Sequence, residues 1–196
     1  MTDWGNLYRQ HVAAIGALAE HLDAAQLATT VPGTPAWTAH DVLAHLAGGP
    51  ADAVSGRIEG APGPEWTARH VGERAGLPVG DLVAELQANT DFVVASLVDN
   101  PRPAVVWDIA VHHADLHEAF GLDRLAERFW LPVAEAIGPT MAPELMAVAP
   151  PYEVFRALFS RRSRSQMAAW GADTDAERLA EMCIFGPRDD DQPMPA

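Results

Sequence analysis

The sequence predicts an all-α fold, in which a four-helix bundle is followed by a short helical C-terminal extension. Apolar residues recur at steps of three and four along most of the 196 residues, which is the period of a helix that buries one face. No segment sustains the alternation of apolar and polar residues that marks a half-buried strand. Four long periodic segments, with an extended loop between the second and the third, are typical of a helical bundle.

The first two helices are separated by a short stretch rich in helix breakers. The first helix is expected over about residues 3–28, and the prolines and glycine of Thr30–Trp37 end it. Thr38 starts the second helix, because Asp41 follows at the spacing of a capping box. Pro50 has no amide hydrogen, so we expect it to kink or end this helix.

The other two helices of the bundle follow a loop rich in Gly and Pro. A short helix is expected near residues 65–75 and a long one over about 79–99. Pro103 suits the first position of the next helix, and Gly121 suits the left-handed residue that follows a helix end. The last helix of the bundle is therefore expected to run to Phe120.

The remainder of the chain is predicted to form an extension of the bundle, with helices over about 123–138 and 152–170. The predicted domains are the helical bundle over residues 1–125, the helical extension over 126–188, and a disordered tail over 189–196. The tail is expected to be disordered because it is acidic and contains proline.

The charge balance and the cysteine count limit the classes of partner. The 27 acidic residues and 13 arginines give a net charge of −14, which disfavours nucleic acids and anionic membranes as partners. Cys183 is the only cysteine and cannot form an internal disulfide. Neither a signal peptide nor a run of about 18 uncharged apolar residues is visible. We therefore expect a cytoplasmic protein, a monomer or homodimer, that acts on a small molecule.

The fourth helix carries ionisable residues on its apolar face. At 100° per residue, Asp108, His112 and Asp115 fall within one stripe, whereas His113 and His117 fall on the opposite arc and are expected to face solvent. Buried charges need a cation or a hydrogen-bonding partner. Two interpretations follow: Asp108 and His112 chelate a metal, or the buried Asp–His pair satisfies itself.

The second helix offers a third ligand for such a metal. His45 lies at the edge of its apolar stripe, and His40 points away from it. A site with three protein ligands and an open fourth position is typical of catalytic zinc. We expect a divalent metal here, with zinc as the first choice, although His and Asp ligands also suit other divalent ions.

Two segments resemble the DinB-like superfamily, and within it the mycothiol-dependent maleylpyruvate isomerase-type proteins: WTAHDVLAHLAGG (Trp37–Gly49) and WDIAVHHADLHEAFG (Trp107–Gly121). The resemblance implies that His45, Asp108 and His112 are the metal ligands and the catalytic residues. Asp108 stands where the closest relatives carry Glu, so its shorter side chain either moves the metal or leaves Asp108 outside the coordination shell.

The resemblance also implies a reaction. The open coordination position would take a low-molecular-weight thiol such as mycothiol, which would serve isomerisation or sulfur transfer on a small electrophilic substrate. Two alternatives keep the bundle: a metal-dependent hydrolase that activates water, and a non-catalytic protein that binds a metal or a ligand.

Arginines cluster in the extension, where four of the 13 lie between Tyr152 and Trp170. Arg161 and Arg162 are the predicted cofactor-binding residues, because a guanidinium fork suits the carboxylates of a thiol or substrate. The alternative is a solvated helix face that pairs with surface acids, and we favour it for any single arginine.

Overall fold

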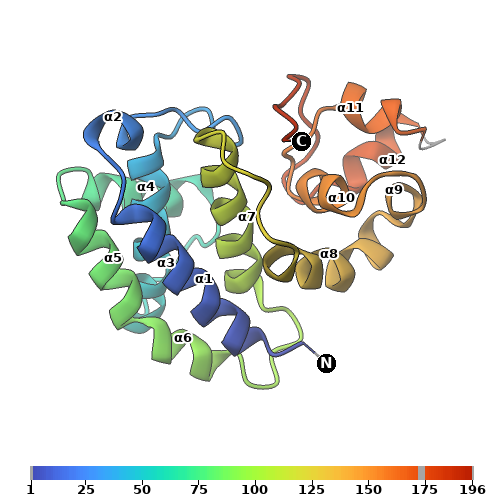
Figure 1. The fold of residues 1–196 in the computed structure, drawn as a ribbon. Helices are drawn as coiled ribbons and strands as arrows, with labels where there is room; N and C mark the ends of the chain where they lie inside the picture. Colours follow the sequence, from blue (N-terminus) through green and yellow to red (C-terminus); the bar gives the residue numbers. More distant parts are fainter. Residues whose placement is uncertain (1, 172–174, 196) are drawn as a thin grey trace. The chain divides into compact units, whose positions relative to one another are not determined.

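The computed structural model describes residues 2–171 and 175–195. Within these residues all regular secondary structure is helical, apart from isolated bridges between Thr30 and Thr38 and between Ser163 and Arg188. This confirms the predicted all-α class. The chain forms two compact units that meet in sequence between Phe120 and Gly121 (Figure 1).

The first unit is a helical bundle whose main helices are α1, α3, α5 with α6, and α7 (Figure 1). Helix α1 packs against α5, α6 and α7, while α3 packs against α4, α5 and α7. Helix α7 therefore has neighbours on two sides. The bounds of the helices are α1 Trp4–Ala19, α2 Ala24–Leu27, α3 Ala39–Ser55, α4 Pro64–Arg74, α5 Val79–Ala88, α6 Thr90–Ser96 and α7 Ala104–Ala119.

Helix α3 begins as predicted but does not end where Pro50 stands. The Thr38 side chain accepts a hydrogen bond from the Asp41 amide, and the Asp41 carboxylate accepts one from the Thr38 amide, which confirms the capping box. The helix continues through Pro50 to Ser55, and Gly56 closes it at φ 73°. Burial of α3 between α4, α5 and α7 therefore outweighs a loss of about 3 kcal/mol for an interior proline.

Two helices that were predicted as continuous are broken. Helix α1 ends at Ala19, and α2 starts separately because Asp23 and Gln26 form their own capping box. The helix predicted over 79–99 is divided at Asn89, whose side-chain amide donates a hydrogen bond to the Glu85 carbonyl. In both places a side chain hydrogen-bonds to a backbone group that a continuous helix would pair with another backbone group.

The second unit is built around α8 and α10, which pack against each other through aromatic side chains such as Trp130, Tyr152 and Phe155. One helix was predicted over 152–170, but Ser160 at φ 61° separates α10 from α11. The helices of this unit are α8 Glu127–Met141, α9 Pro143–Val148, α10 Pro151–Leu158, α11 Arg164–Ala169 and α12 Ala176–Glu181.

The last described residues are hydrogen-bonded to α11 and the residue before it. The Ser163 hydroxyl donates to the Asp191 carboxylate at 2.5 Å, and the Gln166 amide donates to the Gln192 carbonyl at 2.7 Å. Residues 189–195 of the tail predicted over 189–196 lie among the described residues and Ala196 lies outside them; the disorder of this tail stays a prediction. The domain boundaries after residues 125 and 188 stay predictions. Among the described residues, no helix is both long and apolar enough to cross a membrane.

Candidate metal centre

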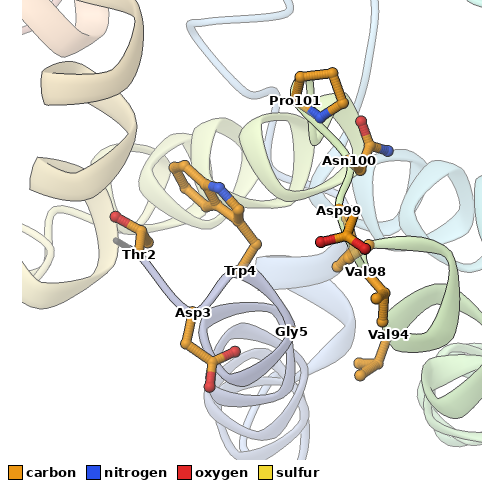
Figure 2. Close-up of a pocket in the computed structure, with 10 residues that line it drawn as sticks. Thr2, Asp3, Trp4, Gly5, Val94, Val98, Asp99, Asn100 and Pro101 are labelled. Carbon is orange, nitrogen blue, oxygen red and sulfur yellow. The ribbon is translucent and has the colours of Figure 1, made fainter.

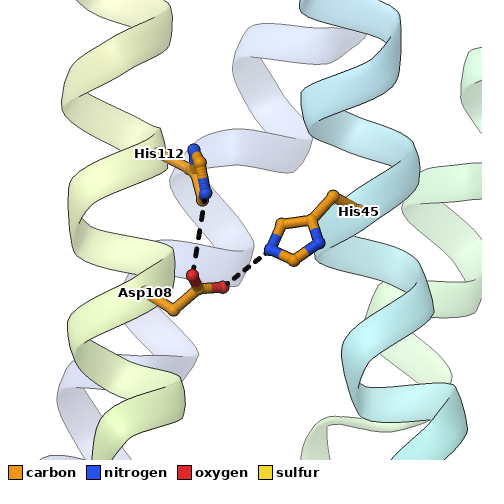
Figure 3. Close-up of side chains that lie close together, drawn as sticks. All are labelled: His45, Asp108 and His112. Atoms are coloured by element: carbon orange, nitrogen blue, oxygen red, sulfur yellow. Dashed lines mark ion pairs between the residues drawn. The ribbon is translucent and has the colours of Figure 1, made fainter. Parts of the chain in front are cut away.

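Helices α3 and α7 bring together the three residues predicted as metal ligands. His45 Nε2 lies 3.3 Å from Asp108 Oδ2, and His112 Nε2 lies 3.6 Å from Asp108 Oδ1. Figure 3 shows the Asp108 carboxylate between the two imidazole rings. One ligand atom from each of the three residues lies within 4.8 Å of the others. The sequence prediction that these side chains converge agrees with this geometry.

The two sides of this cluster differ in their exposure. The rings of His45 and His112 are buried, whereas 43% of the Asp108 side chain is exposed. Trp37 borders the cluster, with its ring centroid 5.0 Å from that of His45 and 5.8 Å from that of His112. A small molecule would therefore reach the cluster from the Asp108 side.

The inner nitrogen of His112 faces a second carboxylate. His112 Nδ1 lies 2.9 Å from Oδ2 of Asp115, which is fully buried one turn further along α7. The pair is within ion-pair distance but lacks hydrogen-bond geometry, because His112 Nδ1 has no hydrogen-bond partner among the described residues. The negative charge of Asp115 still favours a proton on Nδ1 over a lone pair there, which leaves the lone pair on Nε2.

The inner nitrogen of His45 faces His70, a residue that sequence reasoning missed. His45 Nδ1 lies 3.2 Å from His70 Nδ1, and His70 Nε2 lies 3.1 Å from Asp52 Oδ2. Burial, followed by the neighbouring His45, lowers the pKa of His70 to about 4, so the ring is neutral near pH 7. The sequence held one signal for the partner of His70, although not for His70 itself: Asp52 follows His45 by seven residues and so lies on the same face of α3.

Asp52 is held as an ionised carboxylate although it is fully buried. Burial acts to raise its pKa, but hydrogen bonds from Arg69 and His70 and the charge of Arg57 outweigh this and leave the pKa below its usual value. Arg69 Nη2 lies 2.5 Å from Asp52 Oδ2, and Arg57 Nη2 lies 2.7 Å from Oδ1.

Tyr8 of α1 brings a polar group into the same region. Its hydroxyl is buried and has no hydrogen-bond partner among the described residues. Burial, together with the negative charge of Asp108, raises the pKa of Tyr8 well above its usual value. The hydroxyl therefore keeps its proton and lies within the electrostatic reach of Asp108.

The prediction that His113 faces solvent is wrong. His113 is buried, and its Nδ1 lies 3.0 Å from Nδ1 of the buried His11. His117 is half-buried, with its ring centroid 5.1 Å from that of His113. The helical-wheel argument assigned one buried face to α7, but α7 packs against both α1 and α3 and so buries two.

Arg161 and Arg162 belong to the second unit and are both buried, so the preferred expectation of a solvated helix face is wrong for this pair. Arg162 Nε donates to the Glu153 carboxylate at 2.5 Å, and Arg161 Nη1 donates to the Phe159 carbonyl at 2.7 Å. Their binding of an anionic group stays a prediction. Cys183 is also buried here, and burial raises its pKa to about 11, which disfavours a nucleophilic thiolate.

A pocket lies elsewhere in the first unit, around Trp4 at the start of α1 and the turn Val98–Pro101 after α6 (Figure 2). Its volume is about 560 Å³. None of the residues that line it belongs to the His45, Asp108 and His112 cluster.

The fold and the cluster define a helical-bundle protein with a candidate metal centre on two neighbouring helices. Residues 8–128 match the model of the family described as the mycothiol maleylpyruvate isomerase N-terminal domain, and the chain belongs to that family. This confirms the DinB-like resemblance, and all three residues of the cluster lie within the matched range. No curated protein and no solved structure matches the chain.

Proposed function

We propose that this protein is a metal-dependent enzyme that uses a low-molecular-weight thiol of the mycothiol type. Its reaction would be isomerisation or sulfur transfer on a small electrophilic substrate. His45, Asp108 and His112 would hold one divalent ion, with zinc as the first choice. The cytoplasmic location and the monomeric or homodimeric state are part of this proposal.

One observation carries the metal centre: one potential ligand atom from each of His45, Asp108 and His112 lies within 4.8 Å of the other two. With the His112 proton on Nδ1 beside Asp115, His112 Nε2 and an Asp108 oxygen are two acceptors 3.6 Å apart. His45 Nε2 approaches the same carboxylate at 3.3 Å. Ligand atoms in a tetrahedral zinc site with bonds of about 2.0–2.2 Å lie about 3.3–3.6 Å from one another. The two His–Asp distances, each to a different oxygen of the Asp108 carboxylate, have this length and support a divalent cation at the cluster.

The choice of a thiol is supported by the family and by the surroundings of the site. A bound divalent ion supplies acidity, since a coordinating thiol is deprotonated near neutral pH. The exposed side of Asp108 leaves the cluster accessible to a solute, while the Trp37 ring covers His45 and His112. Binding of an anionic group by Arg161 and Arg162 is proposed from the sequence alone, and both residues lie in the second unit.

The test is a spectroscopic titration of the cobalt-substituted protein with mycothiol. Thiolate-to-cobalt charge transfer absorbs in the near ultraviolet, so we expect a new band in the wild type and none in His45→Ala. His40→Ala is the matched control, because His40 lies on the same helix but bonds to the Leu77 carbonyl instead of the cluster. The control should give the wild-type band.

Two outcomes would overturn the thiol proposal. If saturating mycothiol leaves the cobalt spectrum unchanged while the protein hydrolyses an ester or amide, the hydrolase alternative is correct. If the cobalt spectrum changes but no turnover with thiol or water is found across small electrophiles, the protein is a metal- or ligand-binding bundle.

A further inference from the structure

We propose that His70 and Asp52 are positioning residues that fix the proton of His45 on Nδ1, so that His45 Nε2 always presents a lone pair to the metal. This inference rests on the metal centre of the proposed function and is independent of its thiol. It assigns a role to α4, a helix that supplies none of the three candidate ligands.

The chain of contacts begins at the Asp52 carboxylate. Asp52 lies in α3, is fully buried, and contacts Arg57 and Arg69 through different oxygens. An ionised carboxylate only accepts hydrogen bonds. His70 Nε2, 3.1 Å from Asp52 Oδ2, must therefore be the nitrogen that carries a proton.

The next contact transmits this choice to His45. When the proton of a neutral imidazole is on Nε2, Nδ1 is an acceptor. His70 Nδ1 lies 3.2 Å from His45 Nδ1, and two acceptors would repel at that distance. His45 Nδ1 must therefore carry the donor hydrogen, which leaves a lone pair on Nε2. Because the Asp108 carboxylate, 3.3 Å from Nε2, is also an acceptor, this arrangement requires a cation between the two atoms. Outer carboxylates commonly orient metal-ligating histidines, and here a second histidine lies between the carboxylate and the ligand.

The sequence makes room for this contact at one glycine. A Cβ atom on Gly48 would lie 2.6 Å from both Cβ and Cγ of His70, which is closer than non-bonded atoms approach. Trp66, one turn before His70 on α4, packs edge-to-face against the His70 ring with ring centroids 4.1 Å apart. His70 thus packs against both α3 and the Trp66 ring, in reach of both His45 and Asp52.

The inference is tested by the tautomer of His45, measured by long-range proton–nitrogen correlation NMR on metal-free, ¹⁵N-histidine-labelled Asp108→Ala protein at about pH 8, above the usual His pKa. Asp108→Ala is the background because the Asp108 carboxylate would otherwise compete for a proton on His45 Nε2. With His70 unchanged in this background, we expect the His45 proton on Nδ1. In His70→Phe, which has no acceptor, we expect a mixture of tautomers, and His70→Gln should restore the wild-type state through its carbonyl oxygen. In Asp52→Asn, the side-chain amide can donate a hydrogen bond to His70 Nε2, so that the His70 proton moves to Nδ1. This variant should therefore also populate the His45 tautomer that carries its proton on Nε2.

Metal affinity gives a second readout with the same variants. By competition with a chelator, zinc should bind about 10–100-fold more weakly to His70→Phe than to the wild type. His40→Phe is the control and should bind zinc as the wild type does. A His45 proton on Nε2 in Asp108→Ala with His70 unchanged overturns the inference, whether or not the His70 and Asp52 variants fold. An unchanged tautomer and affinity in folded His70→Phe would do so as well. If the wild type binds no divalent ion, the proposed function fails, while the tautomer measurement still decides this inference.

Discussion

His112 and His113 are consecutive residues on α7 that have different surroundings. His112 faces Asp108 and Asp115, whereas the His113 ring lies against the ring of His11. Both are buried because α7 packs against α3 and α1. We therefore assign His112 to the candidate metal centre and His113 to the packing between α7 and α1.

This assignment predicts different effects of the two substitutions. His113→Gln should lower the free energy of unfolding by about 1–3 kcal/mol, because a buried contact with His11 is lost. Its metal content should not change. His21→Gln, at an exposed position, should stay within about 0.5 kcal/mol of the wild type. Denaturant unfolding and metal analysis measure both quantities. Loss of metal in His113→Gln together with retention in His112→Gln would show that the assignment is inverted.

The Tyr8 hydroxyl allows a second prediction for a single residue. In the metal-free protein, Tyr8→Phe should leave stability unchanged or raise it by about 1 kcal/mol, because it removes a buried hydroxyl without a partner among the described residues. Thermal unfolding of the two proteins is the measurement. A loss of more than about 1 kcal/mol would mean that the hydroxyl makes a hydrogen bond that stabilises the fold.

Among the helices, the contact between α3 and α4 places His70 beside the candidate metal centre. It depends on Gly48, where a side chain would collide with His70, and on Asp52, whose charge is balanced by Arg57 and Arg69. Gly72 of α4 offers a comparison, since a Cβ there would have no described atom within 4 Å.

These two glycines should respond in opposite directions to alanine. Gly48→Ala should destabilise the protein by about 1–3 kcal/mol, because His70 and α4 must move. Gly72→Ala should stabilise it by about 0.5–1 kcal/mol through helix propensity alone. Urea unfolding of the two variants gives both values. Equal effects would mean that α4 is not packed tightly against Gly48.

The sequence could predict the helices that carry the candidate ligands because α3 and α7 are long and have a clear helical period. Angular positions on α7 were enough to group Asp108, His112 and Asp115. They could not give the surroundings of His113, which depend on how many helices pack against α7. His70 was missed because α4 follows a long loop and has little apolar periodicity of its own. The breaks at Ala19 and Asn89 depend on local capping bonds, which periodicity does not register.

For the whole molecule, the buried His70 predicts a pH dependence of stability. Its pKa is about 4 in the folded protein and 6.5 ordinarily, so the unfolded chain binds more protons between these values. As the pH falls from 6.5 toward 4, proton uptake by His70 in the unfolded chain lowers the free energy of unfolding by up to about 3 kcal/mol. Above pH 6.5 His70 is neutral in both states, and this loss is absent. Denaturant unfolding of metal-free protein across this range is the measurement. His70→Phe should lack this part of the slope, and an equal slope in both proteins would contradict it.

The central claim is that His45, Asp108 and His112 bind one divalent ion, and metal analysis tests it most directly. The protein is purified without chelators, its metal is measured per chain, and a metal-free sample is reloaded with zinc. We predict about one ion per chain in the wild type, recovery of that value on reloading, and loss of the metal in folded His112→Ala. A fully folded wild type that contains no metal and takes up none on reloading would contradict the claim.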